Sequence, residues 1–257
     1  CRGMRRYGLY VSGTQENQAD PHVANVGAML ESEQVGRLYP AMAARAVTKY
    51  GHSKGWKRNR LRTASGFTLD ALGLDTDIRG VKMDEQRPDF IVVDDIDHPF
   101  DNPAAVRKKI DALGLSLFPA GAEDLIILVI QNLVHAGGVV AQILDGRAEL
   151  LADRLTSGPV PAISGEYVIE ETGDEERPWR IVGGEPTWEG QGREACETKL
   201  ATIGPSAWES EAQHKARRKL GGLFDDVLEG IAHCLRSEVP DLVRKSICVD
   251  PATTDTD

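Results

Sequence analysis

The residues with the most chemical potential are three carboxylates within four positions at the end of a short apolar run. Phe90–Val93 leads directly into Asp94, Asp95 and Asp97. Such a run is typical of a buried strand in a parallel sheet, and open α/β sheets bind ligands at the carboxyl ends of their strands. A magnesium ion on nucleotide phosphates needs a carboxylate on a rigid element. The alternative is an ordinary buried strand followed by a solvated acidic turn.

Two amides occupy the corresponding place after a second apolar run. Leu125–Ile130 is followed by Gln131 and Asn132. An amide side chain can hydrogen-bond both a phosphate oxygen and a water molecule, so both residues are candidates for the same site. The competing interpretation is that they satisfy nearby backbone groups at the end of the strand.

The elements that must position these side chains alternate between strand and helix. This alternation predicts a doubly wound α/β domain with a mostly parallel sheet flanked by helices. A helix is expected after Gly13-Thr14, either capped by Asp20 with Pro21 at its first position or kinked at Pro21. Asn102 and Pro103 should start another helix in the same way. The predicted strands are 7–12, 56–62, 66–69, 87–94 and 125–130, and the later helices are 102–113 and 138–155.

The remainder of the chain has a different character. Residues 157–177 are rich in Gly, Pro and acids and should form a solvated loop or a hairpin. Helical stretches are expected over 189–203 and 206–219, and a strand over 243–249. This region is expected to be a linker or subdomain.

Bulk composition limits the class of protein. The chain has 257 residues, a net charge of −10 and a pI of about 5.2, which argues against a generally basic nucleic-acid coat protein. Its four cysteines are scattered without a Cys-x-x-Cys pair, so they indicate neither a zinc site nor a disulfide framework. No stretch reaches the roughly 18 apolar residues of a membrane helix. The simple expectation is a cytosolic protein with reduced thiols.

One segment departs from the acidic average. Residues 34–69 contain no acid and eight Lys or Arg residues. Within a strand over 56–62, the side chains of Arg58, Arg60 and Arg62 would share a face. This face could bind a polyanion such as DNA, or it could be a solvated edge strand whose charge discourages aggregation.

Several short segments, taken in order, resemble the large terminase subunit of tailed bacteriophages, the ATP-driven motor that packages DNA. Each segment is weak alone, and their order and spacing across nearly the whole chain carry the resemblance. The segments are Tyr10–Ala19 with His22-Val23, Ile78–Gly80, Arg87–Asp97, Leu128–Asn132 with His135, Pro186–Trp188, Trp208–His214 and Val249–Asp257.

The resemblance implies a fold and a domain order. ATPase domains of this family are of the P-loop class, and their nuclease domains have an RNase H-like fold. Here the implied domains are an ATPase domain over 1–185, a linker subdomain over 186–240 and the start of a nuclease domain over 241–257. Asp250 would match the first metal-binding carboxylate of that nuclease domain. Because two-metal nucleases need several converging acids, cleavage by this chain is not expected.

The resemblance also implies roles in ATP hydrolysis with Mg²⁺. Asp94 corresponds to the Walker B aspartate, and Asp95 to the residue that orients the attacking water, which is usually Glu; Asp97 is a further candidate. Gln131 and Asn132 match the motif that couples hydrolysis to domain motion. Arg79 would be an arginine finger reaching a neighbouring subunit, although it could instead pair with nearby acids.

The largest departure from the family concerns the phosphate loop. No Gly-x-x-x-x-Gly-Lys-Ser/Thr occurs in the sequence. We therefore expect a fragment that lacks this loop and the first strand, and that binds and hydrolyses ATP poorly. Expected partners of the parent protein are double-stranded DNA, the portal protein, the small terminase subunit and sibling copies in a ring, in the host cytoplasm. The alternatives are a non-catalytic prophage or metagenomic remnant acting as a binding module, and a helicase-like ATPase.

Overall fold

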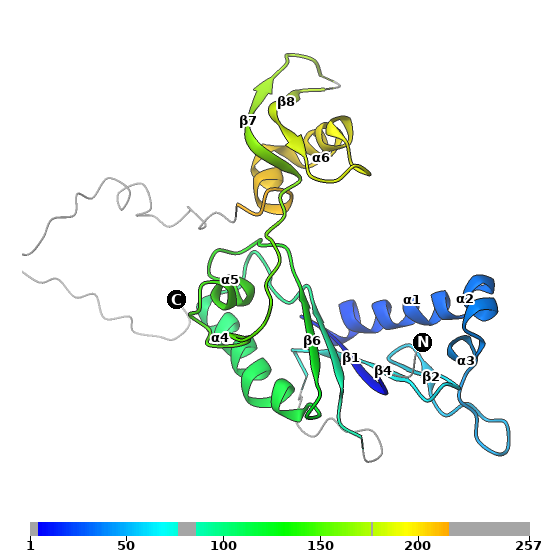
Figure 1. The fold of residues 1–257 in the computed structure, drawn as a ribbon. Coiled ribbons are helices and arrows are strands. Elements are labelled where there is room, and N and C mark those ends of the chain that lie inside the picture. Colours follow the sequence, from blue (N-terminus) through cyan, green and yellow to red (C-terminus); the bar gives the residue numbers. More distant parts are fainter. Residues whose placement is uncertain (1–4, 77–85, 176, 216–257) are drawn as a thin grey trace, which may run out of the picture. The chain divides into compact units, whose positions relative to one another are not determined.

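The computed structural model describes residues 5–76, 86–175 and 177–215 (Figure 1). The chain divides into two units, 1–218 and 219–257, and every described residue belongs to the first. Arg79, Asp250 and the strand predicted over 243–249 lie outside the described residues.

A mixed, mostly parallel sheet forms the centre of the first unit, as predicted for an α/β fold. Its six strands run in the order β2-β3-β4-β1-β5-β6. Strands β4, β1, β5 and β6 are parallel to one another, whereas β3 is antiparallel to both of its neighbours, β2 and β4. The strands are β1 (Tyr7–Ser12), β2 (Trp56–Lys57), β3 (Arg60–Arg62), β4 (Thr68–Gly73), β5 (Phe90–Asp94) and β6 (Ile126–Ile130).

Helices cover both faces of this sheet because β1 and β5 present apolar side chains to each side. Leu9, Val11, Ile91 and Val93 are fully buried and pack with residues of α4 (Pro103–Ala112) and α5 (Val139–Leu144). On the other face, residues of β3 and β4 pack with residues of α1 (Asp20–Leu30). Figure 1 shows α1 apart from α4 and α5. The doubly wound arrangement follows from alternation along central strands.

The helix after β1 begins earlier than a cap at Asp20 would allow. A π turn, η1 (Gln15–Ala19), precedes α1, and Asp20 itself is helical with φ −61°. The backbone N–H of Ala19 reaches the Thr14 carbonyl at 3.1 Å, so Thr14 is the residue before the first turn. The predicted Asp20 cap is therefore wrong. A π turn can accept the Pro21 ring, which clashes with a carbonyl in a regular α-helix.

Among the other predicted helices, the start of α4 agrees with the prediction and the end of α5 does not. Asn102 caps α4 as expected, accepting a bond of 2.8 Å from the Ala105 N–H. Helix α5 ends at Leu144 rather than near residue 155, because the chain turns at Gly146 with φ +78°. The short remaining helices are α2 (Glu33–Leu38), α3 (Pro40–Ala43), η2 (Leu113–Leu117) and η3 (Phe118–Ala120).

The predicted strand over 56–62 is two strands. Lys57 and Arg60 are paired residues of the β2–β3 hairpin, so Arg58 lies in its turn. The expectation that Arg58, Arg60 and Arg62 share one strand face is wrong, because the period of two is interrupted between the strands. The strand expected at 66–69 begins at Thr68 and extends to Gly73.

A second apolar core forms beyond the sheet. The hairpin of β7 (Ile163–Glu171) and β8 (Trp179–Pro186) confirms the hairpin alternative for the acidic region. It packs against α6 (Arg193–Glu211), which is divided by Gly204 at φ +78° and by Pro205, near the predicted break. Ile163, Ile181, Leu200 and Trp208 are buried together in this core. The expected domain boundary after residue 185 lies at the end of β8, so it divides the elements β7, β8 and α6 that build this second core.

Among the described residues, no helix combines the length and the apolar character needed to cross a membrane.

Candidate functional site

The parallel strands bring the sequence-predicted acids and amides to one edge of the sheet. Val93 pairs with Val11, and Asp94 pairs with Ile130, so β1, β5 and β6 all end there. The N–H of Asp95 donates to the Ile130 carbonyl at 3.3 Å. Residues 94–97 and 131–132 are therefore neighbours across two adjacent strand ends, which suits candidates for one site.

Asp94 is half-buried at this edge and has an aromatic partner rather than a cation. The Tyr10 hydroxyl donates to Asp94 Oδ2. The Tyr10 ring stacks on the imidazole of His22, with ring centroids 5.3 Å apart. Burial, followed by the hydrogen bond to Asp94, raises the pKa of the Tyr10 phenol. Within the described part of the chain, no donor reaches Asp94 Oδ1, so this oxygen can face a ligand.

Asp95 follows in an unusual backbone conformation. Its φ is +48°, in the left-handed region, and its side chain is exposed. Partial burial of the carboxyl group and then the charge of Asp94 raise the pKa of Asp95, while His22 opposes the shift. The backbone therefore turns directly after β5, at a point where two adjacent carboxylates repel each other.

Asp97 has a structural task. Its carboxylate accepts bonds from the N–H groups of Val139 at 2.7 Å and Val140 at 3.0 Å, and so caps α5. A Cβ atom at Gly138 would lie 2.6 Å from Asp97 Oδ2, so glycine is needed for this approach. Both carboxylate oxygens of Asp97 are therefore occupied, which argues against Asp97 as a substitute for Asp95.

The two amides differ in their surroundings. Gln131 Oε1 accepts a bond of 3.0 Å from the Asp97 N–H, and its Nε2 donates to the Asn132 carbonyl at 3.1 Å. The strand-end alternative thus describes Gln131, whose side chain satisfies nearby backbone. Asn132 is exposed. Gln131 ties the end of β6 to the loop after β5, and through Asp97 to α5.

Lys109 is a further residue of this region that sequence reasoning missed. Its ammonium group forms an ion pair with Asp101 and donates to the Ile96 carbonyl at 2.6 Å. His135 Nε2 lies 2.9 Å from the Asp101 carbonyl oxygen. Although burial favours the neutral acid, the bonds from Lys109 and from the His98 backbone hold the pKa of Asp101 below its usual range. No sequence spacing identifies this pairing.

The side chains of Gln15 and Gln18, which follow β1, also form hydrogen bonds with backbone groups. Gln15 Oε1 accepts a bond of 2.8 Å from the Gly73 N–H, and its Nε2 donates to the Ala71 carbonyl at 3.1 Å. Gln18 Oε1 accepts from the Thr14 N–H at 2.9 Å. These contacts join the carboxyl ends of β1 and β4, so the segment has a structural role at the same edge.

The three candidate DNA-contact arginines are not equivalent. Arg60 makes two bonds of 2.6 Å to the Asp70 carboxylate, which also accepts 2.9 Å from the Tyr7 hydroxyl. Arg58 donates to the Glu16 carbonyl at 3.0 Å and is exposed, whereas Arg62 is half-buried. Arg60 therefore serves first as the partner of a buried aspartate.

The donor set limits which metal the site can hold. No group of three or more His, Cys, Asp or Glu residues suited to a metal ion exists within the described ranges. Magnesium bound with a nucleotide needs only one or two protein carboxylates, because phosphates and waters complete its shell. Asp94, with Asp95 beside it, fits a metal delivered with a nucleotide and does not fit an all-protein metal site.

No protein-family model, curated protein or solved structure matches this chain.

Proposed function

We propose that this chain belongs to the ATP-hydrolysing motor that packages double-stranded viral DNA into procapsids. The observation that carries the proposal is the common carboxyl edge of β1, β5 and β6, where Asp94 and Gln131 stand on adjacent strand ends. Parallel sheets bind nucleotides at such an edge. The resemblance of the sequence to large terminase subunits supplies the packaging function, and with it the P-loop identity of the sheet.

In this proposal, each residue at the edge has a limited task. Asp94 holds the magnesium ion of MgATP, while Tyr10 fixes the orientation of its carboxylate. Asp95 orients the attacking water, since phosphoryl transfer depends mainly on positioning and charge stabilisation. Asn132 contacts the terminal phosphate, and Gln131 passes changes at β6 to the loop that carries Asp97.

Other parts of the proposal concern the parent protein. A phosphate loop would have to be supplied from outside the printed sequence, which contains none. Arg79 would reach the phosphates of a neighbouring copy in a ring, and Asp250 would begin the metal site of an RNase H-like nuclease domain. The proposed partners are duplex DNA, the portal protein and the small terminase subunit, in the host cytoplasm.

ATP turnover by the parent protein tests the proposal. Asp94→Ala should lower the rate by about 100-fold or more, because the charge that holds the metal is lost. Asp111→Ala, which removes an exposed carboxylate of α4, is the matched control and should leave the rate unchanged. Equal turnover in the two variants, with both folded by circular dichroism, would remove the basis of the proposal.

A second candidate, a non-catalytic binding module, is favoured by one observation. The side chains of Gln131 and Asp97 are both engaged in holding backbone. Reading the gene on both sides of the printed sequence distinguishes the two. An in-frame Gly-Lys-Ser/Thr loop upstream supports the motor, whereas a stop codon supports the remnant.

A further inference from the structure

Residues 44–64 comprise the outer sheet strands β2 and β3 and the loop that leads into them, and we call this segment the basic arm. Its base is closed by the N–H of Ala64 donating to the Ala44 carbonyl at 2.8 Å. Further along, the N–H of Lys54 donates to the Ala46 carbonyl, also at 2.8 Å. Isolated bridges pair Arg45 with Thr63 and Val47 with Ser53. Figure 1 shows the loop of the arm extending beyond β2 at the lower right.

The tip of the arm is fixed by local bonds. The hydroxyl of Thr48 accepts from the N–H of Tyr50 at 3.3 Å and from that of His52 at 3.2 Å. Gly51 takes a φ of +84°, which a side chain would resist. These bonds fix the backbone that carries Lys49 and Tyr50. The Tyr50 side chain is 75% exposed.

The arm concentrates positive charge on an acidic protein. It contains no acid and seven Lys or Arg residues, against a net charge of −10 for the chain. Arg45 bonds Glu31 at 3.0 Å, Arg60 pairs with Asp70, and Arg58 donates to the Glu16 carbonyl at 3.0 Å, so these arginines are engaged within the protein. Lys49, Lys54 and Lys57 are exposed, and no carboxylate of the described chain forms an ion pair with them.

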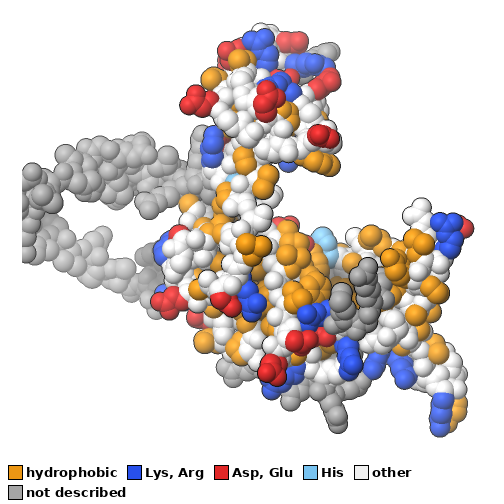
Figure 2. Space-filling model, viewed as in Figure 1, with side chains coloured by type: hydrophobic (Ala, Val, Ile, Leu, Met, Phe, Trp, Pro, Cys, Tyr) orange, Lys and Arg blue, Asp and Glu red, His pale blue; other side chains and the backbone are white. Residues whose placement is uncertain are grey.

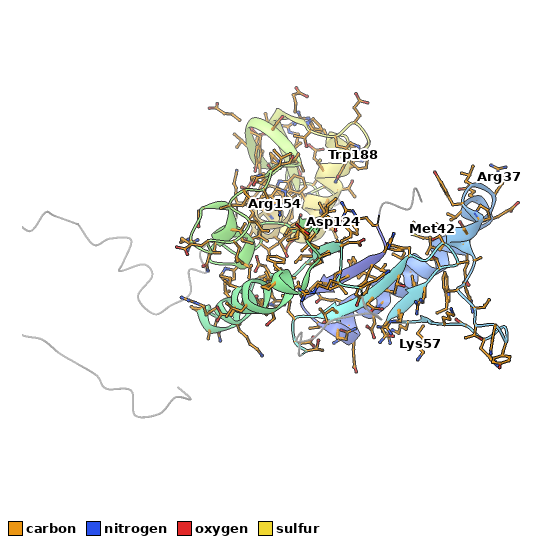
Figure 3. All side chains as sticks on the ribbon, turned by 60° about the horizontal axis from the view of Figure 1, so that its bottom comes forward. Arg37, Met42, Lys57, Asp124, Arg154 and Trp188 are labelled. Carbon is orange, nitrogen blue, oxygen red and sulfur yellow. The ribbon has the colours of Figure 1, made fainter. Side chains whose placement is uncertain are left out.

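The charged side chains gather on an accessible surface. Figure 2 shows blue side chains over the arm at the lower right, with no red among them. In Figure 3, Lys57 points away from the sheet. Several cations of one sign on one accessible surface create a positive potential, which attracts a polyanion.

We propose that the basic arm binds the phosphate backbone of duplex DNA through Lys49, Lys54 and Lys57. The aromatic content favours a duplex over a single strand, because single-strand sites stack successive bases on several aromatic rings. Here Tyr50 is the exposed ring, and the ammonium group of Lys49 lies 4.8 Å from its centroid. Trp56 is half-buried, with the Arg45 guanidinium 5.4 Å from its ring centroid.

The choice of duplex DNA as partner also rests on the proposed function, but the arm is tested without nucleotide. A failure of ATP turnover and a failure of DNA binding are therefore seen in separate experiments. The inference moves the expected DNA contact from the Arg58, Arg60 and Arg62 set to the lysines of the arm, because Arg60 already neutralises a buried aspartate.

Fluorescence anisotropy with a labelled DNA duplex of about 30 base pairs, titrated at several salt concentrations, tests the inference. The triple variant Lys49→Ala/Lys54→Ala/Lys57→Ala should lower the log–log salt slope by about 3 and the affinity by roughly 100-fold at 0.1 M salt, since each phosphate contact contributes about 0.9 to the slope. The control is Arg107→Ala/Lys108→Ala/Lys199→Ala, which removes three exposed cations elsewhere. It should bind as the unaltered protein does.

Three results would overturn the inference. The first is a loss of affinity that is equal in the two triple variants, since this would reflect net charge alone. The second is tighter binding to a single-stranded 30-mer that Tyr50→Leu abolishes, which would make the tip a stacking site. The third is binding to phosphatidylserine vesicles without binding to the duplex. Thermal melts of every variant establish that each is folded.

Discussion

At the scale of single residues, the carboxyl edge of the sheet is defined by how each acid is satisfied. Asp94 accepts a bond from Tyr10, Asp97 caps a helix, and Asp95 lies beside both in a left-handed conformation. Three acids that look alike in sequence thus have three separate environments. Only Asp94 and Asp95 are left to face a ligand, which agrees with a site where a nucleotide brings most of the metal's ligands.

Substitutions at Asp95 should separate charge from backbone strain. Asp95→Asn keeps a side chain that tolerates a positive φ and removes repulsion with Asp94, so it should stabilise the fold by a few tenths of a kcal/mol at an exposed position. Asp95→Ala removes the same charge but should be about 1 kcal/mol less stable than Asp95→Asn. Urea unfolding measures both, and equal stability of the two variants would contradict the strain argument.

At the scale of elements, the loop after β5 is joined to its neighbours at several points. Asp97 joins it to α5, Gln131 joins it to β6, and Lys109 joins it to α4. The loop is therefore held by three elements that all follow it in sequence. A displacement at the end of β5 would therefore be transmitted directly to α4 and α5.

Removing the cap of α5 should be costly. Asp97→Ala leaves the N–H groups of Val139 and Val140 without their acceptor and should destabilise the fold by about 1–2 kcal/mol. Asp111→Ala, on the exposed side of α4, should change stability by less than about 0.5 kcal/mol. Chemical denaturation compares the two, and equal losses would argue against the capping role.

The Asp101–Lys109 pair should make the stability of the fold depend on pH in the acidic range. Because the pKa of Asp101 is lowered in the folded protein, its contribution is present above the unfolded value of about 3.9 and is lost as pH falls through the folded value. The stability difference between the unaltered protein and Asp101→Asn should be constant near neutral pH and should shrink below about pH 4. A difference that stays the same at pH 3 would contradict this account.

The elements also show what the sequence could predict and why it failed elsewhere. Apolar runs located β1, β5 and β6, and Asn102 located the start of α4, because these signals are local. The end of α5 and the division of β2 from β3 depend on positive φ at Gly146 and on strand pairing. The sequence placed Asp94 and Gln131 each at the end of an apolar strand, but the pairing of β5 with β6 and the contacts of Tyr10 and Lys109 are tertiary features that no local signal shows.

At the scale of the whole molecule, the described chain has separate apolar cores. One is built around β1 and β5, and another around β7, β8 and α6, with no residue in common. The candidate site stands at the edge of the first. The basic arm extends from the same sheet, so a nucleotide and a DNA contact would be carried by one set of strands.

Core substitutions should act locally. Leu200→Ala should cost about 2–5 kcal/mol and raise amide exchange in β7, β8 and α6, while amides of β1 and β5 stay protected. Ile91→Ala should do the reverse. Hydrogen-exchange mass spectrometry resolves the two regions. Uniform loss of protection in both variants would mean that the cores unfold together.

The central claim is that Asp94 holds the magnesium ion of a bound nucleotide. Its most direct test is electron paramagnetic resonance of Mn²⁺ with ATP and the parent protein, comparing Asp94→Asn with Asp111→Asn. We predict that Asp94→Asn weakens nucleotide-dependent Mn²⁺ binding by about 100-fold or more, while Asp111→Asn leaves it unchanged. Unchanged Mn²⁺ affinity in a folded Asp94→Asn protein would contradict the account.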